Sequence, residues 1–377
     1  MRLLIIGNVF APFSSGGSAV IAKLQVDWFQ KHKINTRVIT LNNCFKSTYP
    51  DVSFIETENL FSFFDLNKKN IGQRLMFHYK DLLPNQELLK IARDFSPDWI
   101  LTHNLTGLGW GSINQIKTKY PQIKWAHFLH DVQFFEPSGQ IYYQENLTIF
   151  KNIWRKYWAK KRQQVFGNPD LIISPSQWLI DIHQKYHLFQ NIKKIVLPNP
   201  IFNQDSQQNL NNQKGFIYVG RLSKDKGVEF LLSAIQSFSN IHLKIIGSGP
   251  LATKVKKIAQ SNSNLVYLGS LSNTQVIQHM QQAQTLIMPS LIMENQPTVI
   301  LEAVFSNLNV IATNVGGVQE LIKGYGQIIE PNNILDLQKA IKNSLTQKPD
   351  QKIRQEILKK HQINHVMQEF LDYLLKA

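Results

Sequence analysis

The chain has 377 residues, enough for two globular domains, and its 43% hydrophobic and 18% charged residues are typical of a soluble globular protein. Its 41 basic and 26 acidic residues give a net charge of +15, which favours phosphates, nucleic acid or an acidic membrane surface as partners. The one cysteine, Cys44, excludes an internal disulfide and argues against a thiol-ligated metal, and no run reaches the ~18 apolar residues of a membrane span.

Short apolar runs in the first half predict the strands of a parallel sheet. Each is nearly continuous and is bounded by turn residues, as in strands covered by helices on both faces. The start, MRLLIIGNVF, lacks the small-residue cleavage pattern of a signal peptide, so we expect a first strand there and a reducing, cytoplasmic location. The predicted strands are residues 2–7, 36–41, 98–103, 123–130 and 170–176.

Two loops after these strands carry residues suited to a ligand. Gly16 and Gly17 follow the first strand, before a helix expected to begin near Ser18, and glycines there let phosphate or sugar approach the backbone. The loop is not GxGxxG, so a dinucleotide fingerprint is absent. His130 and Asp131 follow the fourth predicted strand. A histidine at such a strand end is either a structural residue or a functional one, and the sequence leaves both open.

The segment KNIWRKYWAKKR, from Lys151 to Arg162, has six basic residues and no acid. Trp154 and Trp158 stand at i, i+4, with cations on the remaining faces of the expected helix. One interpretation is a helix at a membrane surface, which would bring the protein to a lipid-linked acceptor and place the protein at the inner face of the membrane. The other is a helix whose tryptophans pack inward while its lysines are solvated.

The second half starts after a polar stretch without periodicity, residues 198–214, which we predict to be a linker. Strand and helix patterns then alternate at the short spacing of a doubly wound α/β sheet. We expect domains at 1–197 and 198–359, with a final helix within 351–377, about 360–377 of it returning to the first domain. Predicted strands are residues 215–220, 242–247, 265–270, 285–290 and 309–314.

The loops after the first two of these strands contain cations and glycines. Arg221 and Lys226 follow GFIYVG, where a strand ends and a helix begins, and two cations there match a doubly charged diphosphate. The alternative is a solvated turn, which is the usual place of such residues. Gly247 and Gly249 follow HLKIIG and allow close approach of a ligand, although a GxG is often a plain turn.

The stretch MPSLIMENQPTVILEA, residues 288–303, places two carboxylates around a helix start. Pro297 suits the first helical position, which leaves Glu294 in the loop and Glu302 one to two turns along the helix. The N–H groups of Thr298 and Val299 would then form an anion site. Carboxylates suit the hydroxyls of a ribose and a sugar. The alternatives, a helix-dipole partner and an exposed charge, explain one glutamate better than both.

Together these residues resemble the retaining glycosyltransferases of family four, of the GT-B fold. The resemblance covers essentially the whole chain and rests on GRLSKDKG (220–227), LKIIGSGPL (243–251), VYLGSLS (266–272), the glutamate pair and NVGGVQELI (314–322). It implies an α/β protein with two doubly wound Rossmann-like domains that face a cleft. It also implies transfer of a hexose from a UDP- or GDP-sugar to a glycan, lipid-linked or other hydroxyl acceptor, in polysaccharide or glycoconjugate synthesis.

The same resemblance implies roles for the phosphate-binding residues. Arg221 and Lys226 would hold the diphosphate and stabilise the leaving group, so that no metal or other cofactor is required. The helix start at Pro297, Thr298 and Val299 would contact the phosphate. Relatives often have glycine at the position of Pro297, and here the proline removes one N–H donor. The family's asparagine-glycine after the interdomain strand is replaced by Asn199-Pro200.

Other roles implied by the resemblance concern the sugars and the base. Glu294 would contact the hydroxyls of the donor sugar, and Glu302 those of the ribose. The base would lie near Gly269 and Leu271. Gly17 would lie near the diphosphate and His130 near the sugar, both from the opposite domain.

Two mechanisms and three other functions could use residues of these types. A double displacement needs a carboxylate nucleophile at the anomeric carbon, and the sequence offers none on the required face, so we favour a front-face route. A nicotinamide oxidoreductase should show GxGxxG. A nucleic-acid-binding protein should show a recognised module. A non-catalytic nucleotide-sugar or glycan-binding protein of the same fold should have lost one of the two glutamates.

Overall fold

The computed structural model describes residues 1–12, 17–42, 51–56, 63–145, 148–201 and 213–376. Contacts within the chain divide it into two compact units. The first comprises Met1–Gln140, Asn146–Pro200 and Val366–Ala377, and the second comprises Ile141–Glu145 and Ile201–His365. Cys44, Gly16 and most of the predicted linker (202–212) lie outside the described residues.

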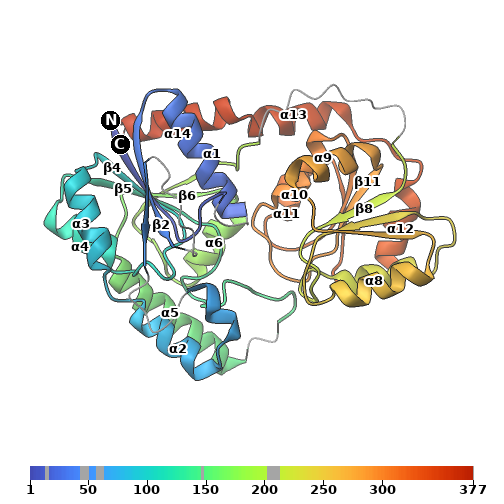
Figure 1. Cartoon of the computed structure of the whole chain (residues 1–377), viewed down its shortest axis with the longest axis horizontal. Helices are drawn as coiled ribbons and strands as arrows, with labels where there is room; N and C mark the ends of the chain where they lie inside the picture. The colour runs from blue at the N-terminus through green and yellow to red at the C-terminus, as the bar shows by residue number, and fades with distance from the viewer. Residues whose placement is uncertain (13–16, 43–50, 57–62, 146–147, 202–212, 377) are drawn as a thin grey trace. The chain divides into compact units, whose positions relative to one another are not determined.

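The first unit is built on a parallel sheet of seven strands in the order β3-β2-β1-β4-β5-β6-β7 (Figure 1). All five predicted strands are present. Sequence analysis missed β3 and β7, because edge strands are covered less completely and lack a continuous apolar run. The strands are β1 (Arg2–Ile6), β2 (Asn35–Leu41), β3 (Val52–Ile55), β4 (Trp99–Thr102), β5 (Lys124–Phe128), β6 (Leu171–Ser174) and β7 (Lys193–Val196).

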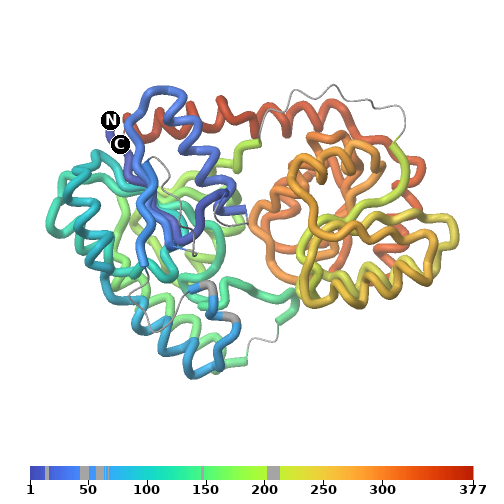
Figure 2. The backbone as a smooth tube through the Cα atoms, viewed as in Figure 1, coloured from blue at the N-terminus to red at the C-terminus, as the bar shows by residue number. Residues whose placement is uncertain are grey.

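Helices cover both faces of this sheet, and the end of the chain contributes one of them. The ring centroids of Phe370 and Phe29 lie 5.9 Å apart, where the C-terminal helix passes beside α1 (Figure 2). The helices are α1 (Gly17–Lys31), η1 (Phe63–Lys68), α2 (Ile71–Lys80), α3 (Gln86–Phe95), α4 (Ser112–Lys119), α5 (Ile149–Phe166), α6 (Gln177–Lys185) and α14 (Ile363–Lys376).

The expectation of one continuous final helix within 351–377 is wrong. Two helices, α13 (Gln351–His361) and α14, are separated by Gln362, whose backbone is extended at φ −60° and ψ 128°. At the end of α13, the carbonyl of His361 accepts a hydrogen bond from the N–H of Ile201 (2.8 Å). This carbonyl is therefore paired with another segment of the chain.

The second unit has a parallel sheet of six strands in the order β10-β9-β8-β11-β12-β13. Its five predicted strands are present, and the short edge strand β13 was missed. The strands are β8 (Phe216–Val219), β9 (Leu243–Ile246), β10 (Leu265–Gly269), β11 (Thr285–Met288), β12 (Asn309–Thr313) and β13 (Gln327–Ile329). With α13, the helices are α7 (Val228–Ile235), α8 (Ala252–Ser261), α9 (Asn273–Gln282), α10 (Thr298–Phe305), α11 (Val318–Ile322) and α12 (Ile334–Ser344).

In each sheet the strand order reverses at one place. In the first unit β1 pairs with both β2 and β4, and in the second unit β8 pairs with both β9 and β11. Open α/β sheets bind ligands beyond the carboxyl ends of the strands at such a reversal. The loops after β8 and β11, and those after β1 and β4, are therefore the first places to look for a site.

Candidate functional site

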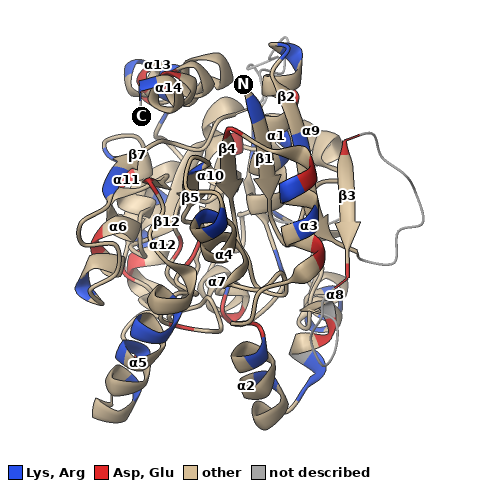
Figure 3. Ribbon diagram, turned by 90° about the vertical axis from the view of Figure 1, so that its left-hand side faces the viewer, with Lys and Arg blue, Asp and Glu red and all other residues tan. Residues whose placement is uncertain are grey.

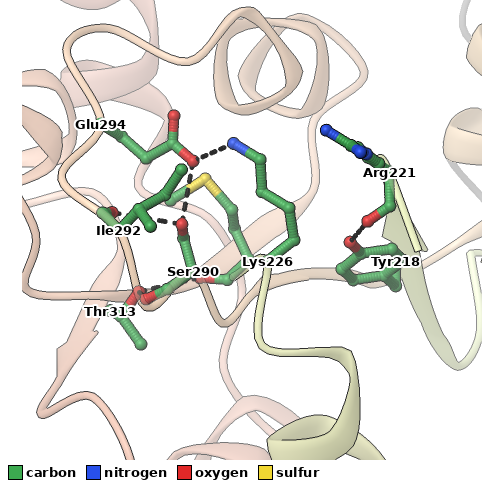
Figure 4. Close-up of polar contacts among 8 residues, drawn as sticks. Tyr218, Arg221, Lys226, Ser290, Ile292, Glu294 and Thr313 are labelled. Atoms are coloured by element: carbon green, nitrogen blue, oxygen red, sulfur yellow. Dashed lines mark hydrogen bonds and ion pairs between the residues drawn. The ribbon is translucent and has the colours of Figure 1, made fainter. Parts of the chain in front are cut away.

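The loops after β8 and β11 bring two predicted site residues into direct contact. Lys226 Nζ lies 2.5 Å from Glu294 Oε1, and the two side chains are 29% and 17% exposed (Figure 4). The residues are 68 positions apart in the sequence. Adjacent parallel strands end at the same edge of the sheet, and this brings the two loops together. The carboxylate thus already has a cationic partner.

Two hydroxyl residues hold Glu294 in place, and sequence analysis missed both. The Ser290 hydroxyl lies 2.9 Å from Glu294 Oε1 and 3.2 Å from the carbonyl oxygen of Ile292. Thr313 Oγ1, at the end of β12, donates to the carbonyl of Ser290 (2.7 Å). A side chain bonded from two directions is preorganised for a ligand. The only signal in the sequence was that each of these two residues stands at a strand end.

The backbone of Glu294 is fixed by the glycine pair of NVGGVQELI. The N–H of Gly317 donates to the carbonyl of Glu294 (2.8 Å), and Gly316 has φ +61°. A Cβ at Gly316 would collide with the carbonyl oxygen of Glu294. Only glycine combines this approach with a left-handed backbone at little cost. The motif therefore supports the glutamate loop.

A short strap from residues 141–145 also fixes this loop. The N–H of Met293 donates to the carbonyl of Ile141, and the N–H of Tyr143 donates to the carbonyl of Leu291, both at 2.8 Å. The Tyr143 hydroxyl donates to Glu330 Oε2 (2.6 Å). The strap was not predicted, because an isolated bridge between Tyr142 and Ile292, about 150 positions apart, leaves no periodic pattern in the sequence.

Arg221 lies in the same region with an exposed side chain. The Tyr218 hydroxyl donates to the carbonyl of Arg221 (2.8 Å), which fixes its backbone. In Figure 4 the guanidinium of Arg221 extends toward the side on which the Lys226 ammonium lies. Two cations and one carboxylate leave a net positive charge at this strand end, which suits an anionic ligand.

The glycines after β9 have a structural role in this conformation. Gly247 has φ +138°, and a Cβ there would collide with the carbonyl of Gly220. The N–H of Leu222 donates to the carbonyl of Ser248 (2.8 Å), so this loop packs directly on the loop that carries Arg221. By contrast, no atom of the described residues beyond its own chain neighbours lies within 4 Å of a Cβ built on Gly269, which is half-buried like Leu271.

The helix after Glu294 begins one residue later than predicted. Pro297 occupies the N-cap position, with φ −68° and ψ 120°, and α10 starts at Thr298. The carbonyl of Pro297 accepts a hydrogen bond from the N–H of Ile300 (3.1 Å). Thr298 and Val299 are half-buried in the first turn, where an α-helix leaves N–H groups without intrahelical partners. Anion binding by these two N–H groups remains a prediction.

Glu302 is half-buried in α10 rather than on an exposed face. Asn273, at the start of α9, donates to its Oε1 at 3.4 Å. Burial raises the pKa of Glu302 to about 7, and the amide of Asn273 opposes this shift. A carboxyl that is half protonated near neutral pH and close to a helix start is a candidate ligand-binding group.

In the first unit, the loops after β4 and β5 join His103 and His130. His103 Nδ1 and His130 Nε2 lie 2.7 Å apart. Asp131 accepts hydrogen bonds from the N–H of Gln133 (2.8 Å) and from the amide of Asn104 (3.1 Å). Burial lowers the pKa of His130 to about 4 and raises that of Asp131 to about 6. At neutral pH the imidazole of His130 is therefore uncharged.

Neighbouring groups complete this cluster. Asn8, in the loop after β1, donates a hydrogen bond to the carbonyl of Thr106, in the loop after β4 (3.0 Å). The two loops at the strand reversal of this unit are therefore linked to each other. Asn104 and His130 line a small cavity of about 10 Å³, room for one water molecule. Gly17 begins α1, and among the described residues no atom other than its own neighbours lies within 4 Å of a Cβ built on it. His103 and Asn104 were missed although His103 ends a predicted strand and Asn104 directly follows it.

The basic segment is only partly as expected. Trp158 is fully buried, whereas Trp154 is 39% exposed, so one tryptophan packs inward and the other does not. Arg155 is buried and pairs with Glu136 at 2.8 Å, and buried Arg162 stacks over the rings of Trp110 and Trp158. The expectation that the cations lie on the faces away from the buried tryptophans is wrong for these two arginines.

The described part of the chain holds neither a cluster of metal-ligating side chains nor a membrane-spanning helix. Within it, no three histidine, cysteine, aspartate or glutamate side chains gather as the ligands of a metal ion would. None of its helices has the length and apolar character needed to cross a bilayer.

Two family models together match nearly the whole chain. Residues 15–202 match the family described as Glycosyltransferase Family 4, and residues 201–361 match Glycosyl transferases group 1. A putative teichuronic acid biosynthesis glycosyltransferase of Bacillus subtilis, TuaC, is 30% identical over 70% of this chain and 74% of its own length.

Solved structures share the fold at low sequence identity. Sucrose-phosphate synthase from Thermosynechococcus elongatus superposes with a TM-score of 0.72 at 14% identity, over 100% of this chain and 99% of its own. HepE from Anabaena, solved in complex with UDP and glucose, gives a TM-score of 0.68 at 14% identity over 99% of both chains.

Proposed function

Since the chain belongs to the glycosyltransferases of the GT-B fold, we propose that it transfers a hexose from a nucleotide diphosphate sugar with retention at the anomeric carbon, as family four does. The observation that carries this proposal is the cluster after β8 and β11. Lys226 pairs there with Glu294, Arg221 lies beside them, and Glu294 stands four residues before Thr298, where α10 begins. Cations beside helix N–H groups suit a diphosphate, and a held carboxylate suits sugar hydroxyls.

The proposed chemistry is a front-face displacement. The bond between the anomeric carbon and the β-phosphate oxygen breaks, and its electron pair leaves with the phosphate. The acceptor hydroxyl forms the new bond on the same face, and its proton passes to the leaving phosphate. Arg221, Lys226 and the start of α10 stabilise the developing charge. This scheme needs no metal ion and no carboxylate nucleophile.

Roles for the remaining residues follow from the resemblance. We propose that Glu294 binds the donor sugar, that Glu302 binds the ribose and that the base lies near Gly269 and Leu271. The roles of Gly16, Gly17 and His130, which belong to the first unit, rest on the resemblance alone.

The acceptor is proposed from the relatives. TuaC is named for teichuronic acid biosynthesis, and HepE was solved with UDP and glucose, so we propose a UDP-sugar or GDP-sugar donor and a cell-surface glycan or its lipid-linked precursor as acceptor. With a lipid-linked acceptor, residues 151–162 would contact an anionic membrane at its cytoplasmic face.

Nucleotide binding is the first test. The purified protein should be stabilised against heat by one of UDP, GDP and ADP, and by the corresponding sugar donor, in the presence of EDTA. Arg221→Ala and Lys226→Ala should lose this stabilisation. Lys224→Ala, which changes an exposed lysine of the same loop, should keep it. A wild-type protein that responds to no nucleotide would overturn the proposal.

Stereochemistry is the second test. Slow hydrolysis of an α-linked donor, followed by proton NMR before mutarotation, should release the α-anomer of the hexose. Release of the β-anomer would contradict retention. Binding of donor without any transfer or hydrolysis would favour a non-catalytic nucleotide-sugar-binding protein.

A further inference from the structure

Two helices of the first unit, α2 and α5, carry large apolar side chains in water. Ile71, the first residue of α2, is 83% exposed, and Phe150, the second residue of α5, is 80% exposed. Isolated apolar residues are normal on a surface, but a group on adjoining helices marks an interaction site. We call the following residues the apolar ends: Ile71, Met76, Ile149, Phe150, Ile153 and Trp154.

The exposure of the apolar ends does not result from loose helices. The hydroxyls of Tyr79 in α2 and Tyr157 in α5 lie 2.8 Å apart, and the ring centroid of Trp158 lies 5.1 Å from that of Tyr79. The opposite side of α5 is anchored by the ion pair of Arg155 with Glu136. Both helices project from the body of the first unit (Figure 3). Their outer ends therefore form a supported surface.

The charged residues of α2 and α5 themselves have one sign. Neither α2 nor α5 contains an acidic residue, whereas Arg74, Lys80, Lys156 and Lys160 are exposed. Apolar and aromatic side chains with cations alone around them are typical of helices that lie at an anionic bilayer. A protein partner would meet the same surface with fixed acids, but the mixture of deeply exposed isoleucine and phenylalanine with flexible lysines fits a lipid interface best.

We propose that the apolar ends of α2 and α5 insert between the headgroups of an anionic bilayer, with Arg74, Lys80, Lys156 and Lys160 at the phosphates. This inference deepens the membrane contact of the proposed function and rests on it for the lipid-linked acceptor. It differs from a contact through residues 151–162 alone, because α2 takes part and because Arg155 and Arg162 are buried in the protein.

Flotation with vesicles tests the insertion. The apo protein should float with vesicles of phosphatidylcholine that contain about one third phosphatidylglycerol, and at least about tenfold less with phosphatidylcholine alone. The triple substitution Ile71→Ser, Phe150→Ser, Ile153→Ser should weaken binding by about a hundredfold. Its matched control, Leu335→Ser, Leu345→Ser, Leu375→Ser, removes exposed leucines elsewhere and should bind like the wild type.

Charge and assembly provide further outcomes. Lys156→Gln with Lys160→Gln should weaken vesicle binding about tenfold, and Lys256→Gln with Lys257→Gln, exposed on α8, should not. A wild-type protein that stays with the solvent, or a triple-serine variant that still floats, would overturn the proposal. So would a wild-type dimer that the triple-serine substitution converts to a monomer. Loss of nucleotide binding by the wild type would instead contradict the proposed function and leave the flotation result standing.

Discussion

The two units have related sheets but opposite chemistry where their strand order reverses. In the second unit, Lys226 and Glu294 form a partly exposed ion pair, and exposed Arg221 lies beside them. In the first unit, buried His103 contacts half-buried His130, and desolvation disfavours the charged form of both imidazoles. Strand topology therefore determines where a site lies, whereas the side chains and their burial decide which ligand it suits.

The contrast has a physical basis in solvation. A diphosphate brings two negative charges, and fixed cations that remain partly hydrated can meet it without a large cost of burial. A sugar brings neutral hydroxyls, for which uncharged imidazole and amide groups are adequate partners. Single substitutions can alter either the charged site of the second unit or the uncharged histidine pair of the first unit.

The largest effect is expected at the charged site. Lys226→Ala should lower the rate of sugar transfer by about a thousandfold, because a cation at the leaving phosphate is lost. Steady-state kinetics with the donor identified by the nucleotide screen would measure it. Lys224→Ala should change the rate by less than about twofold, since that side chain is exposed in the same loop. Near-normal turnover of Lys226→Ala would refute the role of this lysine.

The next largest effect is expected at Gly316, which packs against the backbone of Glu294. Gly316→Ala should lower the free energy of unfolding by about 2 kcal/mol, because the new Cβ meets the carbonyl oxygen of Glu294 at a positive φ. Urea denaturation would measure the loss. Gly17→Ala adds a Cβ into open space at a helix start, so its unfolding free energy should stay within about 0.5 kcal/mol. Equal values for the two variants would contradict this account of the loop.

A smaller effect is expected at the pair of uncharged histidines in the first unit, His103 and His130. His130→Gln should lower transfer about tenfold if the imidazole bonds a substrate hydroxyl. Because burial lowers the pKa of His130 to about 4 from 6.5, its neutral form stabilises the fold above pH 6.5, and this contribution is lost as pH falls toward 4. Stability of the variant should therefore fall less steeply than that of the wild type over this range. The exposed His365→Gln should preserve the wild-type slope.

The smallest effect has the opposite pH dependence. Burial raises the pKa of Glu302 to about 7 from 4.5, so its ionisation destabilises the fold progressively as pH rises from 4.5 to 7, and fully above 7. Glu302→Gln should raise the unfolding free energy by about 1 kcal/mol at pH 8 and leave it unchanged at pH 4. Denaturation at both pH values would test this. Glu356→Gln, on an exposed face of α13, should have no such effect.

Much of the fold was predictable from local pattern. Ten apolar runs bounded by turns predicted ten of the strands in the described chain, because strands covered on both faces must be apolar throughout. The edge strands β3, β7 and β13 escaped, since they are short or polar on one side. The break at Gln362 escaped as well, because α13 and α14 have compatible helical patterns and only a contact with Ile201 marks the interruption.

The sequence by itself determined the chemical types at the strand ends, since Arg221, Lys226, Glu294 and His130 each stand at or shortly after a predicted strand end and Glu302 stands in the helix that follows. Only the tertiary structure decided how these groups are partnered. Lys226 meets Glu294, Ser290 and Thr313 hold the carboxylate, and His103 meets His130, all through strands that are distant in the chain. It also decided that Arg155 and Arg162 are buried while Phe150 is exposed. Pairing and burial depend on which elements pack together, and that information is not local in a sequence.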